Sequence, residues 1–244
     1  MWSDDSQMVV GRNTLHECVS EIRDWPPWCR PNAPRMNKKK ARMIATFLTR
    51  ITEECPYKDK EEDVLINHGV STTLLENLKS GVQEFFNLPM EEKKKFWQHP
   101  GDLEGFGQAF VVSEEQKLDR ADLFYMITLP THLRKPYLLP EFPQPFRDTL
   151  EAYSVKLKAL AMKILDLLAK ALKMEAMDMK ELFEEGWQSF RMNYYPPCPQ
   201  PELVIGLNPH SDAVGLTILL QVNEMEGLQI RKNGITTKIN FFFD

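Results

Sequence analysis

The chain has 244 residues, of which 43% are hydrophobic and 27% are charged. This is the balance of a folded globular protein, and it excludes a mainly disordered chain, a collagen and a simple coiled coil. Acidic residues outnumber Lys and Arg by 35 to 30, so the net charge of −5 gives no general attraction to nucleic acid or anionic lipid, and we expect neither as a partner.

The first 62 residues show little periodicity beyond a short helix predicted at 41–51, so 1–62 is treated as a poorly readable N-terminal segment. Regular patterns begin at residue 63. A short apolar run at 64–66 predicts a strand, and Ser71 is a suitable N-cap for the helix that follows. Apolar residues recur at steps of three and four along that helix: Leu74, Leu75, Leu78, Val82, Phe85 and Phe86.

The strongest helix is predicted at 146–174, because its apolar residues form one stripe that is typical of a supporting helix packed against a core. Shorter helical stretches are predicted at 90–97 and 178–185, and a glycine-spaced extended segment at 100–112. We therefore assign 63–185 to a helical module with a long supporting helix. The stripe consists of Leu150, Tyr153, Leu157, Leu160, Ile164, Leu168 and Leu172.

After Gly186 the pattern changes to short β-type runs separated by Pro, Gly and Asn. Asn233-Gly234 is typical of a hairpin turn. Residues 186–244 therefore form a β-rich part, and the chain as a whole is assigned to the α+β class. The runs lie at 189–195, 203–207, 216–222 and 228–231.

Two further features concern where the chain is found. No apolar run approaches the roughly 18 residues of a membrane helix, and the N-terminus lacks the apolar stretch of a secretory signal, so we expect no membrane partner. The four cysteines form neither a C-x-x-C pair nor a dense framework, which favours reduced thiols and a cytoplasmic location.

The first candidate for chemistry is the pair His210 and Asp212. In an extended segment, positions two apart point to the same side, so one imidazole nitrogen and one carboxylate oxygen can reach the same point. With a second His they would complete the facial triad that holds Fe(II) and leaves coordination positions open. The alternative is a surface turn in which Asp212 caps a backbone amide and His210 has no role. A zinc hydrolase is disfavoured because no H-E-x-x-H run is present.

The second candidate is a polar face on the run that begins at residue 189. Arg191, Asn193 and Tyr195 alternate along this predicted strand and therefore share one side of it. A cation, an amide and a phenol together suit an anionic ligand. The alternative is an amphipathic strand that merely turns its wet side to solvent.

The run R-M-N-Y-Y-P-P-C-P-Q-P-E at 191–202, followed by Gly206 and H-S-D at 210–212, resembles the plant soluble Fe(II)/2-oxoglutarate-dependent dioxygenases of the isopenicillin-N-synthase-like group. I-N-H-G-V at 66–70 and N-L-P at 87–89 resemble the N-terminal module of the same family. The nearest resemblance is to the branch of senescence-related proteins and alkaloid O-demethylases.

This resemblance implies a double-stranded β-helix, or jelly roll, backed by helices, of which the chain carries an incomplete part. It implies that His210 and Asp212 are iron ligands, that Asn193 and Tyr195 contact 2-oxoglutarate, and that Arg191 lies near the substrate. The implied cofactors are Fe(II), 2-oxoglutarate and O₂, with ascorbate as supporting reductant. The implied reaction is hydroxylation or O-demethylation of a small plant specialised metabolite.

The sequence departs from the family pattern at its end. The family places a second His and an R-x-S element several dozen residues after H-x-D, whereas no His follows His210 in these 244 residues. We therefore expect a chain truncated at its C-terminus, and an inactive remnant or pseudo-enzyme is the alternative to an active dioxygenase. An exposed final strand that runs into Phe241-Phe242-Phe243 would favour self-association.

Overall fold

The structure is a computed structural model. The residues that it describes form two compact units. The first unit takes the described residues within 1–69, 159–186 and 210–244, and the second takes those within 70–158 and 187–209. The division into 1–62, 63–185 and 186–244 stays a prediction. The described residues are 8–11, 62–65, 67–99, 102–107, 121–183, 186–207, 210, 214–223, 225, 227–232 and 235–238.

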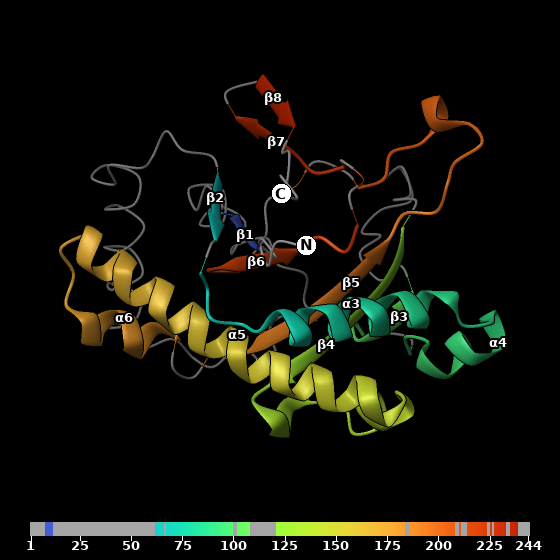
Figure 1. Cartoon of the computed structure of the whole chain (residues 1–244), viewed down its shortest axis with the longest axis horizontal. Coiled ribbons are helices and arrows are strands. Elements are labelled where there is room, and N and C mark those ends of the chain that lie inside the picture. The colour runs from blue at the N-terminus through green and yellow to red at the C-terminus, as the bar shows by residue number, and fades with distance from the viewer. Residues whose placement is uncertain are drawn as a thin grey trace. The chain divides into compact units, whose positions relative to one another are not determined.

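The second unit is built on an antiparallel sheet with the strand order β3-β4-β5 (Figure 1). Its helices are α3, α4 and the first part of α5, and its described residues also form four short 3₁₀ turns. The bounds are β3 Gly105–Gly107, β4 Asp122–Leu129, β5 Gln188–Tyr194, α3 Thr72–Asn87, α4 Met90–Lys93, α5 Gln144–Ala171, and the turns Lys94–Phe96, Thr131–Leu133, Leu139–Glu141 and Pro201–Leu203.

Helix α3 forms where the sequence predicts it. The hydroxyl of Ser71 accepts a hydrogen bond from the backbone N–H of Leu74 at 3.3 Å, which satisfies one of the free donors of the first turn. The predicted stripe is the buried side of the helix, with Leu75 fully buried and Phe85 only 2% exposed. The helix stops before Pro89, which disfavours a helical residue before it.

An aromatic cluster occupies the core of the second unit. Phe85 lies at its centre and makes edge-to-face contacts with five other rings, at centroid distances from 5.3 to 5.9 Å. Such contacts add stabilisation beyond the burial of apolar area, by about 0.5–1.5 kcal/mol per pair. The cluster therefore fixes α3 on the sheet and on the segment before α5. The five partners are Phe86, Phe96, Phe106, Phe124 and Phe142.

Arg134 connects the end of β4 to α5. Its Nε donates to the carbonyl of Thr128 at 2.5 Å, and its two terminal nitrogens donate to the carboxylate of Glu151 at 2.5 and 3.0 Å. The guanidinium is nearly buried, so this two-pronged pair is screened less than a surface ion pair. The connection holds the start of α5 beside the sheet that carries the candidate site.

Glu104 is a buried carboxyl group beside the same sheet. Its Oε2 accepts a hydrogen bond from the backbone N–H of Ile127 at 2.8 Å. Burial raises the pKa of Glu104 above its ordinary value, and Asp102 adds to this effect, while the bond from Ile127 and the charge of Lys135 oppose it. The net result is a carboxyl group that binds its proton more tightly in the folded state.

We predict that the free energy of unfolding of the wild type, relative to Glu104→Gln, falls as the pH rises from about 4.5 through the raised pKa. In that range the unfolded state has already lost the proton that the folded state keeps, so ionisation favours unfolding. Gln keeps the acceptor for Ile127 without a charge. Urea denaturation at several pH values measures the difference, with Glu84→Gln on the exposed face of α3 as control. A difference that does not change with pH would contradict the assignment.

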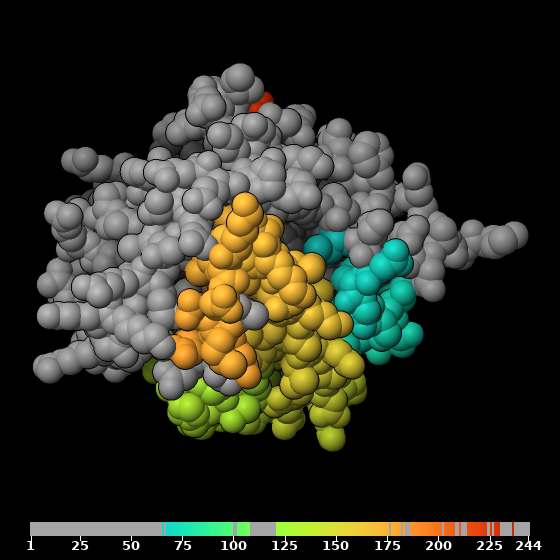
Figure 2. Space-filling model, turned by 90° about the vertical axis from the view of Figure 1, so that its left-hand side faces the viewer, coloured from blue at the N-terminus to red at the C-terminus, as the bar shows by residue number. Residues whose placement is uncertain are grey.

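The first unit combines a three-stranded antiparallel sheet in the order β2-β1-β6, a hairpin and a helical pair. Figure 2 shows α6, in orange, side by side with the C-terminal part of α5, where Leu165, Ala169, Leu172 and Met179 form a buried cluster. The bounds are β1 Met8–Gly11, β2 Glu62–Leu65, β6 Thr217–Leu220, β7 Gln229–Lys232, β8 Ile235–Lys238 and α6 Ala176–Phe183.

The helices predicted after residue 70 and most predicted strands are present, with shifted ends. The helix predicted at 146–174 spans Gln144–Ala171, and it ends early because Lys173 adopts a left-handed φ of 51°. The hairpin predicted at Asn233-Gly234 is confirmed by the pairing of β7 with β8, although these two residues themselves lie outside the described part. The helix predicted at 41–51 and the Phe241–Phe243 edge also lie outside it.

The strand predicted at 203–207 is wrong. A 3₁₀ turn occupies Pro201–Leu203, and the chain then runs to residue 207 without regular structure. Proline fixes φ near the value of a turn and lacks a backbone donor, so Pro201 favours the turn. Leu203 and Val204 are exposed, so no apolar burial draws this segment into a sheet.

The α+β class predicted from the sequence is confirmed by the helices and antiparallel sheets of the two units. Within the described residues, none of the helices combines the length and the apolar character needed to cross a membrane.

Candidate functional site

Strand β5 carries the predicted polar face, and its other face fixes its orientation. Met192 is buried, Tyr194 stacks on Phe86 at 5.4 Å between ring centroids, and Phe190 meets Tyr153 edge to face at 6.3 Å. These three alternate positions point toward the helices of the second unit. The positions between them must therefore face the other side of the sheet.

Arg191 and Asn193 occupy that other side and touch each other. The Nε of Arg191 donates to Oδ1 of Asn193 at 2.9 Å. Asn193 is exposed and Arg191 is half-buried. The shared face that the sequence predicts for these two residues is confirmed.

Tyr125 of β4 lies directly opposite Arg191 in the strand register and is hydrogen-bonded to Ser189. Burial raises the pKa of Tyr125, while the Ser189 bond and the positive charge of Arg191 act in the opposite direction. The phenol therefore stays neutral at physiological pH and keeps its proton to donate. Sequence reasoning missed Tyr125 and Ser189, because nothing local indicates that 122–129 pairs with β5.

Tyr195 follows the last residue of β5 and is exposed. The proline-rich segment after it returns to its side chain at Gly206. A Cβ atom placed on Gly206 would lie 3.2 Å from Cδ1 and 3.3 Å from Cε1 of the Tyr195 ring. The missing side chain at Gly206 thus allows the close approach that supports the ring.

His210 is an exposed residue of the first unit, and residues 208, 209 and 211–213 lie outside the described part. Asp212 is among them, so the shared side of His210 and Asp212 stays a prediction. Gly215 follows this segment and lies so close to Phe183 of α6 that a Cβ atom there would overlap the Phe183 ring. Among the described residues, no group of three or more His, Cys, Asp or Glu side chains could hold a metal ion.

The polar side of β5 suits an anionic ligand. The guanidinium of Arg191 and the carboxamide of Asn193 supply donors to carboxylate or keto oxygens, and the exposure of Asn193 leaves room for a ligand. The place of the Tyr195 phenol on the same side stays a prediction. For a metal, one imidazole nitrogen from His210 and one carboxylate oxygen from Asp212 fit Fe(II) by the chemistry of the donors.

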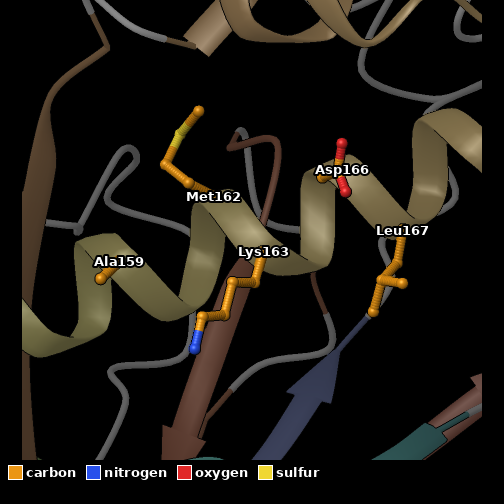
Figure 3. Close-up of a pocket in the computed structure, with 5 residues that line it drawn as sticks. All are labelled: Ala159, Met162, Lys163, Asp166 and Leu167. Carbon is orange, nitrogen blue, oxygen red and sulfur yellow. The ribbon is translucent and has the colours of Figure 1, made fainter.

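An open hollow of about 480 Å³ lies along α5 in the first unit, lined by Ala159, Met162, Lys163, Asp166 and Leu167. Figure 3 shows Met162 and Leu167 projecting to opposite sides of the helix. The hollow contains none of the residues predicted for the site, and its lining is mostly apolar. We do not assign it to the chemistry of the chain.

Two family models match the chain, and together they cover more than half of it. Residues 64–144 match the model described as "non-haem dioxygenase in morphine synthesis N-terminal". Residues 186–241 match the 2OG-Fe(II) oxygenase superfamily. The second match contains all five predicted site residues.

Curated relatives come from several plants. The chain is 64% identical over 170 residues to oxoglutarate-dependent flavonoid 7-O-demethylase 1 of Ocimum basilicum. This match covers 70% of this chain and 46% of that protein. It is 59% identical over 172 residues to Protein SRG1 of Arabidopsis thaliana and 58% identical over 169 residues to codeine O-demethylase of Papaver somniferum. These matches cover 70% and 69% of this chain and 48% and 47% of the relatives. The chain thus spans about half the length of these relatives.

A solved structure supports the fold. The crystal structure of JOX2 in complex with 2OG, Fe and JA matches with a TM-score of 0.55 and 32% identity, over 60% of this chain and 44% of that one. This likeness agrees with the predicted helices plus incomplete jelly roll. The chain therefore belongs to the 2OG-Fe(II) oxygenase superfamily, among the plant 2-oxoglutarate-dependent dioxygenases.

Proposed function

We propose that this chain serves Fe(II)- and 2-oxoglutarate-dependent oxidation, by hydroxylation or O-demethylation, of a small plant specialised metabolite. The observation that carries the proposal is the hydrogen-bonded pair of half-buried Arg191 and exposed Asn193 on one side of β5, inside the segment that matches the 2OG-Fe(II) oxygenase superfamily. Because several of the similar proteins are O-demethylases by name, we propose a methoxylated compound as the substrate of this chain.

In this proposal each predicted site residue has one role. His210 and Asp212 hold the iron through a nitrogen and an oxygen atom. Asn193 and Tyr195 donate hydrogen bonds to 2-oxoglutarate, and Arg191 lies near the substrate. Bound iron with 2-oxoglutarate and O₂ supplies the oxidising chemistry, with ascorbate as supporting reductant. The residues of this chain bind the co-substrate and orient it.

The first test is metal binding by the 244-residue chain. We expect His210→Ala to weaken the affinity for Fe(II), or for Mn(II) as a redox-stable probe, by at least about 10–100-fold, since loss of even an outer-shell partner costs that much. Electron paramagnetic resonance of free Mn(II) measures it. His132→Ala removes an exposed histidine of the second unit and is the matched control, with unchanged affinity.

The second readout is succinate release with 2-oxoglutarate, iron, ascorbate and methoxylated flavonoids or alkaloids. Turnover by the wild type that His210→Ala abolishes supports the proposal. No turnover above that of His210→Ala, together with equal metal affinity in both chains, would instead favour an inactive remnant or pseudo-enzyme. No His follows His210 in these 244 residues, so the comparison of the wild type with His210→Ala tests whether the residues present hold iron without a second His.

A further inference from the structure

The hydrogen bond between Arg191 and Asn193 decides which way the Asn193 amide points. A guanidinium has donors and no acceptor, so the atom 2.9 Å from the Arg191 Nε must be the amide oxygen of Asn193. The Nδ2 group occupies the other branch of the planar amide and therefore points away from the guanidinium. An amide without this partner could turn over and offer either atom.

Arg191 is itself held in place. It is half-buried in the middle of β5, and Tyr125 lies opposite it in the register of β4. On the other face of the strand, Met192 is buried and Tyr194 stacks on Phe86, so β5 cannot rotate to another face. The partner of the Asn193 oxygen thus belongs to a rigid strand, whereas the Asn193 side chain is exposed.

We propose that Arg191 is a positioning residue that fixes the Asn193 amide with its NH₂ group toward the ligand, where it donates to an oxygen of 2-oxoglutarate. This inference rests on the proposed function. It differs from a direct contact between Arg191 and the oxidised substrate, because it places the effect of Arg191 on the affinity for 2-oxoglutarate.

The test compares Arg191→Met, which removes the donor but keeps apolar length, with Arg191→Lys, which restores a donor-only partner. We expect Arg191→Met to raise the Kd of 2-oxoglutarate, measured calorimetrically with Mn(II) present, by about 3–10-fold, the value of one hydrogen bond. Arg191→Lys should recover most of this loss. Lys156→Met, at an exposed position of α5, is the control and should leave the Kd unchanged.

A second measurement reads the amide directly. The side-chain NH₂ signals of Asn193, in protein labelled with ¹⁵N-asparagine and identified by their loss in Asn193→Asp, should move in Arg191→Met and return in Arg191→Lys. These signals report the orientation of the amide and do not depend on turnover.

The outcomes separate two kinds of failure. Shifted Asn193 signals with a raised Kd in Arg191→Met, both recovered in Arg191→Lys, support the proposal. An unchanged Kd, or unchanged Asn193 signals, in a chain whose wild type binds 2-oxoglutarate would overturn it while leaving the proposed function intact. A wild type that binds no 2-oxoglutarate overturns the proposed function and this inference with it.

Discussion

Replacing Phe85 with Ala is expected to lower the free energy of unfolding by about 3–5 kcal/mol, the usual cost of truncating a buried aromatic residue. Phe85 is 2% exposed, and its ring is the one that meets Phe86, Phe96, Phe106, Phe124 and Phe142. Its removal opens a cavity and separates the rings that it joins. Urea denaturation of the full chain, followed by tryptophan fluorescence, measures the change.

Two companion variants make this result specific. Phe85→Leu keeps most of the apolar volume and should lose clearly less stability than Phe85→Ala. Val155→Ala removes apolar atoms from an exposed position of α5, 59% accessible, and should stay within about 0.5 kcal/mol of the wild type. A loss below about 1 kcal/mol in Phe85→Ala would mean that the aromatic cluster is not the core of the second unit.

Helix α3 could be predicted because its signals are local. An N-cap serine, apolar residues at steps of three and four, and a terminating proline all lie within twenty residues of one another, and each has a direct structural counterpart. Such signals need no knowledge of the partner. The position and ends of helix α3 can therefore be predicted from the sequence alone.

Strands β1 and β4 were not predicted, because their evidence lies elsewhere in the chain. Strand β4 reads D-L-F-Y-M-I-T-L and is buried on both faces between β3 and β5, so it lacks the alternation that marks a half-exposed strand. Strand β1 has four residues, and its partners β2 and β6 come from distant segments. Pairing of this kind cannot be inferred from a local pattern.

The candidate site likewise has one part that the sequence predicts and another that depends on distant segments of the chain. The shared face of Arg191 and Asn193 follows from the two-residue period of a strand, and their hydrogen bond confirms it. Tyr125 lies opposite Arg191 because of the register between β4 and β5, and Gly206 lies against the Tyr195 ring because the chain returns there. Neither neighbour could be predicted from the sequence. The placement of His210 with Asp212 stays a prediction, because Asp212 lies outside the described residues.

Gly81→Ala is expected to destabilise the chain by about 2 kcal/mol, although Ala is the better helix former by roughly 1 kcal/mol. Gly81 lies in the middle of α3, where a Cβ atom would overlap Cδ2 of Phe146 and lie 2.6 and 2.7 Å from Cε2 and Cγ of that ring. Phe146 is buried and packs edge to face against Phe142, so the ring has little room to move. Overpacking therefore outweighs helix propensity.

A double-mutant cycle separates these two effects. Phe146→Leu alone creates a small cavity and costs stability, but it also removes the ring edge that faces Gly81. In the Phe146→Leu background, Gly81→Ala should therefore cost much less than in the wild type, and the coupling between the two positions should be favourable by more than about 1 kcal/mol. Thermal and urea unfolding of the four chains measure it. Additive losses, or a Gly81→Ala chain more stable than the wild type, would show that α3 and α5 do not cross as closely as this glycine implies.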